Sequence, residues 1–189
     1  DHSFDINLQV DSPDAQFVSD GNYFPSDGDF KIPIKTRALE KLRVVVIEIK
    51  QENVMHYLAW QSLAYADYYN LRMYGKPVYD QIVPLNQGIR DNEGWTVHGI
   101  DLSARIQKNP GSIYHISMEF GPENTTLSCK KELKKYKVNS KIPTNDYFTI
   151  RDNYYNDYYE YYEDYNWQEN NNPCKLAYYI NKQPTHKLF

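Results

Sequence analysis

Polar and hydrophobic residues alternate along several short stretches of this chain, and the clearest stretch predicts a β-strand. Residues 113–120 place Tyr114, Ile116, Met118 and Phe120 on one face of an extended chain. The other face carries Ile, His, Ser and Glu. A period of two residues is typical of a strand that is buried on one face.

A second stretch, "KLRVVVIEIK" at residues 41–50, predicts a strand that is buried on both faces. It is rich in β-branched residues, which favour the pleated conformation, and charged residues bound it. One face would carry Leu42, Val44, Val46 and Glu48, and the other Val45, Ile47 and Ile49. We therefore expect a central strand of a packed pair of sheets.

Weaker patterns predict further strands at residues 3–10, 32–34, 78–85 and 95–100. Pro33 indicates an edge strand, because proline has no backbone N–H to give to a sheet. Residues 11–30 are rich in Pro, Gly, Asn and acidic residues and are expected to form turns.

Residues 51–75 favour helix over part of their length. Asn53 is placed to cap a helix that carries Met55 and Leu58 and ends by Gly75, although the aromatic content also permits extended structure. A single helical turn is expected to begin at residues 101–103 and to end at 109–111.

The order of these elements predicts the fold class. Many short strands separated by turn signals are typical of an antiparallel β-sandwich, and no regular alternation of strand and helix indicates a parallel sheet. We therefore expect an all-β, immunoglobulin-like sandwich that forms one domain over residues 1–189. It would carry a Tyr-rich, partly helical insertion at about residues 129–174.

Composition narrows the function. The chain has 189 residues, a hydrophobic content of 41%, enough for a core, and a net charge of -4. The negative charge gives no electrostatic case for binding nucleic acid, and no apolar run is long enough to span a membrane. The 19 tyrosines suit a secreted or envelope protein. Since the chain opens on Asp1 rather than Met, we expect a mature or excised piece of a larger protein.

The two cysteines, Cys129 and Cys174, have no CxxC spacing, so neither a zinc finger nor the usual redox motif is indicated. In an oxidising compartment they would pair and close a loop of about 45 residues, worth roughly 4 kcal/mol by loop entropy. Otherwise they would be two buried thiols. We predict the disulfide, because the unusual Tyr-rich segment lies between them and needs an anchor.

The stretch "RDNYYNDYYEYYEDYNW" can form a short amphipathic helix, with Asp152 placed to cap it. Its tyrosines fall on one arc, and its acidic residues fall on the opposite arc. Four interpretations remain open: a sugar-stacking surface, a calcium site at Asp157, Glu160 and Asp164, a flexible acidic loop, and a structural insert held by the disulfide. The aromatic surface would consist of Tyr154, Tyr158, Tyr161, Tyr162, Tyr165 and Trp167.

No catalytic, metal-binding or cofactor-binding motif appears. The five histidines show no HxH, HxxxH or HExxH spacing, and there is no GxSxG, P-loop or GxGxxG pattern. We therefore expect a protein that is not an enzyme and holds no cofactor or metal. Asn124-Thr125-Thr126 matches a glycosylation acceptor, which matters only in a eukaryotic secretory host.

Several segments, in order, resemble the bacterial alpha-2-macroglobulin family, in particular its Bacteroidetes-type members. The resemblance extends over nearly the whole chain, and the order of the segments is more specific than any one of them. The segments are "GNYFP" at 21–25, "IPI" at 32–34, "VVVIEI" at 44–49, "NVMHYL" at 53–58, "GKPV" at 75–78, "IDLSARIQKNPGSIYHISMEF" at 100–120 and "NPC" at 172–174 with Tyr178 and Tyr179.

The resemblance implies one macroglobulin-like domain from the N-terminal half of a large, lipid-anchored protein of the periplasm or cell envelope. Such parents trap proteases through a bait region, and many use a Cys–Gln thioester. That thioester string is absent here, since Lys-Lys-Glu follows Cys129 and Lys-Leu-Ala follows Cys174. We therefore expect a structural domain whose partners are neighbouring macroglobulin-like domains of the parent chain. The alternative is a carbohydrate-binding module of a surface glycan-uptake system, suggested by the tyrosines and by Trp60, Trp95 and Trp167.

Overall fold

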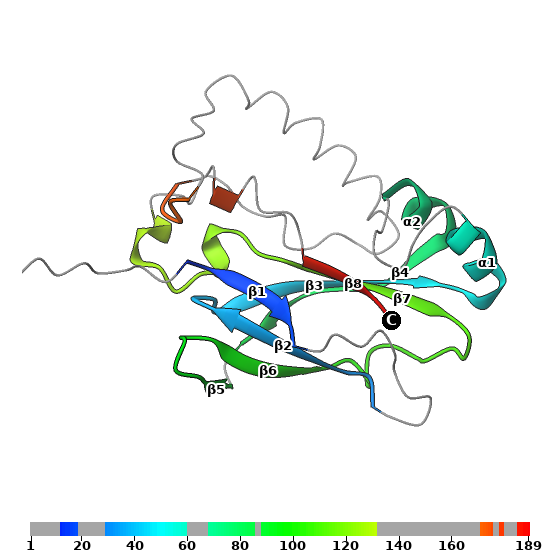
Figure 1. Ribbon diagram of the computed structural model, residues 1–189, viewed down its shortest axis with the longest axis horizontal. Coiled ribbons are helices and arrows are strands. Elements are labelled where there is room, and N and C mark those ends of the chain that lie inside the picture. The colour runs from blue at the N-terminus through cyan, green and yellow to red at the C-terminus, as the bar shows by residue number, and fades with distance from the viewer. Residues whose placement is uncertain are drawn as a thin grey trace, which may run out of the picture.

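The computed structural model describes residues 12–18, 29–59, 68–85, 88–131, 171–175, 178–179 and 185–189. Its strands form two four-stranded antiparallel sheets that lie in two layers (Figure 1). The first sheet has the order β1 (Asp14–Phe17), β2 (Lys31–Arg37), β6 (Thr96–Asp101) and β5 (Ile89–Arg90). The second has the order β4 (Gly75–Pro84), β3 (Lys41–Ile49), β7 (Ile113–Glu119) and β8 (Thr185–Leu188). The predicted all-β sandwich is confirmed.

The main core lies between the two sheets. Alternate residues of β2 and β3 point inward, so that Ile32 and Ile34 pack in one cluster with Val44 and Val46. All four are at most 1% exposed. Removing this apolar surface from water is the main stabilising term of the sandwich, at about 25 cal/mol per Å².

The outer face of β3 is buried as well, against a helical layer at one end of the molecule (Figure 1). That layer consists of α1 (Gln51–Ala59) and α2 (Tyr68–Tyr74). Val45 and Ile47 pack with Tyr57 of α1 and Leu71 of α2. The prediction that residues 41–50 form a central strand with two apolar faces is confirmed.

The chain turns from α2 into β4 at Gly75 without an intervening loop. A Cβ atom at this position would lie 2.5 Å from Cγ2 of Ile47 and 2.6 Å from the carbonyl oxygen of Leu71. Only glycine allows this close approach of helix and sheet.

The prediction that Pro33 marks an edge strand is wrong. β2 is an inner strand, paired with β1 on one side and β6 on the other. The carbonyl oxygen of Pro33 accepts a hydrogen bond from the backbone of Val18, at 3.1 Å. In a strand, the nitrogen and carbonyl oxygen of one residue point to the same side, so the missing N–H also faces this side. β1 ends at Phe17, so the missing N–H lies at the very end of the β1–β2 ladder and costs at most one bond.

The helix between residues 51 and 75 is confirmed in part, but the predicted cap is wrong. Helix α1 begins at Gln51, so Asn53 lies inside its first turn. The Asn53 side chain donates instead to the carbonyl oxygen of Tyr74, at 3.3 Å, and so links α1 to the end of α2.

Three short strands were not predicted. β1 lies within the stretch expected to form turns, β5 has only two residues, and β8 lies near the end of the sequence. Each is too short to show a period of two residues clearly. The predicted strand at residues 3–10 lies outside the described residues.

Candidate functional site

The cystine is the first predicted site that the structure tests. Cys129 and Cys174 form a disulfide with Cα atoms 5.6 Å apart, across a sequence separation of 45 residues. Cys129 lies in η2 (Ser128–Lys131), shortly after β7. The backbone N–H of Cys174 donates to the side chain of Asn172, at 2.9 Å, so a local turn presents the second sulfur. The prediction of the disulfide is confirmed.

Two tyrosines attach the segment after Cys174 to the sandwich. The hydroxyl of Tyr178 donates to the carbonyl oxygen of Pro13, at 2.6 Å, and that of Tyr179 donates to Pro173, at 2.8 Å. The Tyr179 ring also packs edge-on against Phe120. Burial raises the pKa of Tyr179 to about 12.

The predicted aromatic surface and the alternative calcium site both lie outside the described residues. This applies to Tyr154, Tyr158, Tyr161, Tyr162, Tyr165 and Trp167, and to Asp157, Glu160 and Asp164. Both therefore stay predictions, as does the helix proposed for this segment.

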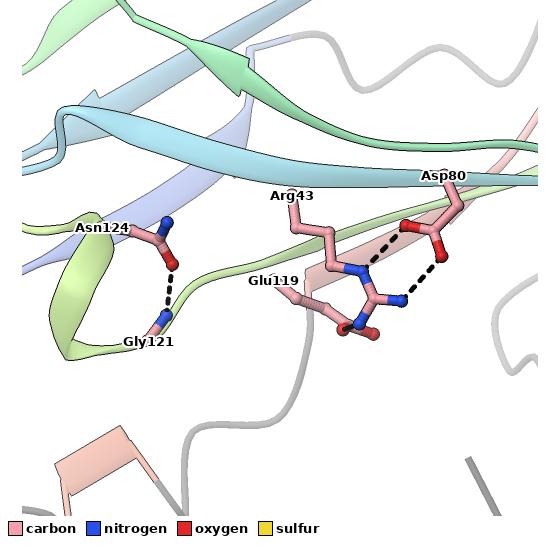
Figure 2. A network of polar contacts seen from close by, with 5 residues as sticks. All are labelled: Arg43, Asp80, Glu119, Gly121 and Asn124. Carbon is pink, nitrogen blue, oxygen red and sulfur yellow. Dashed lines mark hydrogen bonds and ion pairs between the residues drawn. The ribbon is translucent and has the colours of Figure 1, made fainter. Parts of the chain in front are cut away.

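A buried charge cluster lies on the outer face of the second sheet (Figure 2). Arg43 of β3 makes two hydrogen bonds with Asp80 of β4, from Nε to Oδ1 at 2.8 Å and from Nη2 to Oδ2 at 2.7 Å. Its Nη1 donates to Glu119 of β7 at 3.1 Å. The Arg43 and Asp80 side chains are 6% and 3% exposed. The cluster therefore joins three adjacent strands through side chains that face little water.

A second buried acid, Glu48, holds the connection between β6 and β7. Its Oε1 accepts hydrogen bonds from the Asn109 amide, at 2.6 Å, and from the Ser112 hydroxyl, at 3.0 Å. Tyr114 is opposite Glu48 in the sheet, and its hydroxyl accepts the N–H of Asn109. Burial raises the pKa of Tyr114. These contacts fix the "NPGS" turn that the sequence placed before the strand.

Asn124, the residue of the glycosylation motif, has a structural role. Its side-chain oxygen accepts the backbone N–H of Gly121, at 2.9 Å, and caps η1 (Pro122–Asn124) (Figure 2). Asn124 is 2% exposed, so its amide nitrogen is not accessible for glycan transfer in the folded chain.

A cleft of about 270 Å³ lies at one end of the sandwich, and we call it the end cleft. Segments from both sheets meet there: the connection from β2 to β3, the end of β4, the β5–β6 hairpin and the segment after η1. Its aliphatic lining is Ala38, Leu39, Leu85 and Leu127. Its polar lining is Thr36, Arg90, Thr96, His98 and Thr126, and Gly94 completes the wall.

Sequence reasoning missed the end cleft, although a signal was present. The inward positions of β2 read Ile32, Ile34 and then Thr36, and His98 takes an inward position of β6. A polar residue at the next inward position of a strand marks the place where the apolar core ends. The short β5 and the β2–β3 connection could not be placed from the sequence, so these residues could not be brought together.

Trp95 bears on the carbohydrate interpretation. It is 8% exposed, and the cations of Lys35 and Arg37 lie 4.8 Å and 5.0 Å from its ring. The ring is covered by these side chains and presents no open face for a sugar. Trp60 and Trp167 lie outside the described residues.

Within the described ranges, no three His, Cys, Asp or Glu side chains gather into a group that could hold a metal ion. In the same ranges, no helix is both long and apolar enough to cross a membrane. The expectation of no metal and no cofactor stays a prediction.

Comparison with known proteins gives a limited result. No protein-family model and no curated protein matches the chain. Two solved structures are similar, both fragments of alpha-2-macroglobulin from Escherichia coli. A fragment spanning domains MG0-NIE-MG1 has 18% identity and a TM-score of 0.45, over 58% of this chain and 34% of that one. A fragment spanning NIE-MG1 has 16% identity and a TM-score of 0.42, over 58% and 53%. The chain thus spans about a third to a half of these structures, and TM-scores this low carry no argument about function.

Proposed function

We propose that this chain is a non-catalytic, macroglobulin-like β-sandwich domain of a larger envelope protein that traps proteases. The observation that carries the proposal is the placement of the segments that resemble the family. "IPI" lies in β2, "VVVIEI" in β3, "GKPV" at the start of β4 and "SIYHISMEF" in β7. The first of these segments lies in the first sheet and the other three lie in the second, so together they contribute to both layers of one sandwich, as parts of a single domain would.

The buried charges support a structural role. Arg43 is engaged by Asp80 and Glu119, and Glu48 is engaged by Asn109 and Ser112. Both sets of contacts join strands or fix a turn within the sandwich. These groups hold the fold together and serve no chemistry that the described contacts reveal.

The cystine supports an oxidising location, because structural disulfides persist in secreted and periplasmic proteins. We propose a periplasmic or envelope location and a lipid-anchored parent, both of which depend on the resemblance to the family. The partners would be the adjacent macroglobulin-like domains of the same parent.

Protease trapping has a recognisable assay. A trapped protease can no longer cleave large substrates but still cleaves small ones, because only small substrates can reach it inside the trap. The natural protein that contains this chain is incubated with a general protease, and cleavage of casein and of a small chromogenic peptide is measured. Casein cleavage should fall while peptide cleavage remains, and chain 1–189 alone should change neither rate.

Unchanged casein cleavage with the whole protein would refute protease trapping. Inhibition by chain 1–189 alone, through direct block of a protease active site, would refute the assignment as a structural domain. The carbohydrate-binding alternative is not proposed, because no described residue favours it and Trp95 is covered.

A further inference from the structure

The interior of the sandwich becomes polar at the end cleft. In β2 the inward residues Ile32 and Ile34 are followed toward the cleft by Thr36. In β6, Ile100 lies opposite Ile32, and the next inward residue toward the cleft is His98, opposite Ile34. Thr36 and His98 are 2% and 7% exposed and are joined by a hydrogen bond of 3.0 Å between Oγ1 and Nε2. Buried polar groups are costly unless they are bonded, so this pair forms a stable polar wall at the end of the core.

The opposite rim of the cleft is held by backbone hydrogen bonds and is therefore preformed. Ala38 adopts a left-handed conformation with φ of 52°, which residues other than glycine seldom adopt. Its carbonyl oxygen accepts the N–H of Thr126, at 3.0 Å. The next residues are tied in the same way: Glu40 N–H donates to Asn124 O at 2.7 Å, and Leu85 N–H donates to Glu40 O at 2.9 Å. A ligand would not have to order this rim, which lowers the cost of binding.

The lining chemistry selects for a negatively charged group on a short apolar stem. Arg90 brings a guanidinium cation, and Thr96 and Thr126 bring hydroxyl donors. None of the lining residues carries a carboxylate, so nothing in the wall repels an anion. The aliphatic part of the lining can cover a few methylene groups.

We propose that the end cleft binds a carboxylate carried on a short aliphatic chain. A volume of about 270 Å³ has room for a carboxylate with a few methylene groups. The carboxylate oxygens meet Arg90 and the threonine hydroxyls, and the stem lies against the leucines. This chemistry is shared by a free short-chain acid and by an Asp or Glu side chain of a polypeptide partner.

The test is a titration of chain 1–189, with its disulfide intact, followed by amide signals in two-dimensional NMR. Propionate represents the free acid, and a glutamate residue capped at both ends represents the polypeptide source. Propionamide, which has the same shape without the charge, is the control ligand. Both carboxylates should give saturable shifts at Thr36, Thr96 and Thr126, and propionamide should not. The tighter carboxylate identifies the source.

Variants locate the site. Arg90→Gln should weaken carboxylate binding about tenfold or more, because it removes the charged donor of the lining and keeps a polar side chain of similar reach. Thr126→Val tests a second exposed donor on the opposite rim. Arg105→Gln, which changes a cation outside the cleft, should leave binding unchanged. The proposal is overturned if no saturable shift occurs, if propionamide shifts the same signals equally, or if Arg90→Gln and Arg105→Gln bind alike. None of these results bears on protease trapping, which is measured on the whole natural protein.

Discussion

Replacing Arg43 with methionine should destabilise the sandwich far more than any change to a surface ion pair. Methionine keeps an unbranched apolar stem and removes the guanidinium cation. Asp80 and Glu119 would then be left close together and poorly hydrated, with side chains 3% and 14% exposed. The cost therefore comes mainly from the carboxylates left behind rather than from the lost hydrogen bonds alone.

The size of the effect follows from the burial of the cluster. Removing one partner of a buried ion pair costs about 3–5 kcal/mol, which is a large fraction of the stability of a typical domain. For a chain of this length, each kcal/mol lowers the melting temperature by about 2–4 °C, so the expected loss is roughly 6–20 °C.

Urea unfolding followed by circular dichroism measures this loss, with the disulfide intact in every variant. Lys31→Met is the matched control, because Lys31 also contacts two acids, Asp29 and Asp101, but on the exposed surface. It should leave the unfolding midpoint unchanged. The triple variant Arg43→Met, Asp80→Leu and Glu119→Leu should recover most of the stability, since it removes all three charges of this cluster together. A loss below about 1 kcal/mol for Arg43→Met would contradict the reasoning, because that is the value of an exposed pair.

Three further predictions concern other parts of the fold. Replacing both Cys129 and Cys174 with serine should lower the free energy of unfolding by about 4 kcal/mol at most, by the loop-entropy relation, and equal urea midpoints with and without reductant would argue against this. Gly75→Ala should cost about 1–3 kcal/mol, because its Cβ has no room beside Ile47, and an unchanged melting temperature would show that α2 can shift away. Burial raises the pKa of Tyr179 to about 12 from the ordinary 10.0, so the folded state holds this proton more tightly. The stability it contributes is complete below about pH 10 and is lost as pH rises to about 12. Tyr179→Phe should therefore flatten the decline of stability in that window alone, as measured by urea unfolding at a series of alkaline pH values.

The sandwich was predictable where strands were long and their alternation was complete. β3 and β7 show their faces in the sequence, because the inward positions are apolar over seven or more residues, with Glu48 near the end of β3 as the exception. The disulfide was predictable for a different reason, since a chain with two cysteines offers only one intramolecular pairing.

The rest depended on contacts between distant segments. Pro33 could not be assigned to an inner strand without knowing that β1 ends at Phe17, beside its missing donor. Asn53 could not be linked to Tyr74 without the packing of α1 on α2. Predicting the end cleft would have required placing four separate segments side by side. Such segments lie at strand ends and in connections, where the sequence shows no periodic alternation of polar and apolar residues.

β7 and β8 are hydrogen-bonded neighbours in one sheet, although residues 120–184 separate them along the chain. The chain thus leaves the second sheet at β7 and returns to it at the adjacent strand, β8. The order of the strands therefore does not depend on the length of the sequence between them. Doubling such an excursion costs only about 0.6 kcal/mol of closure entropy. The domain can therefore accept length variation here. Grafting a foreign peptide between the two cysteines should leave the pairing of β3 with β4 and β7 intact.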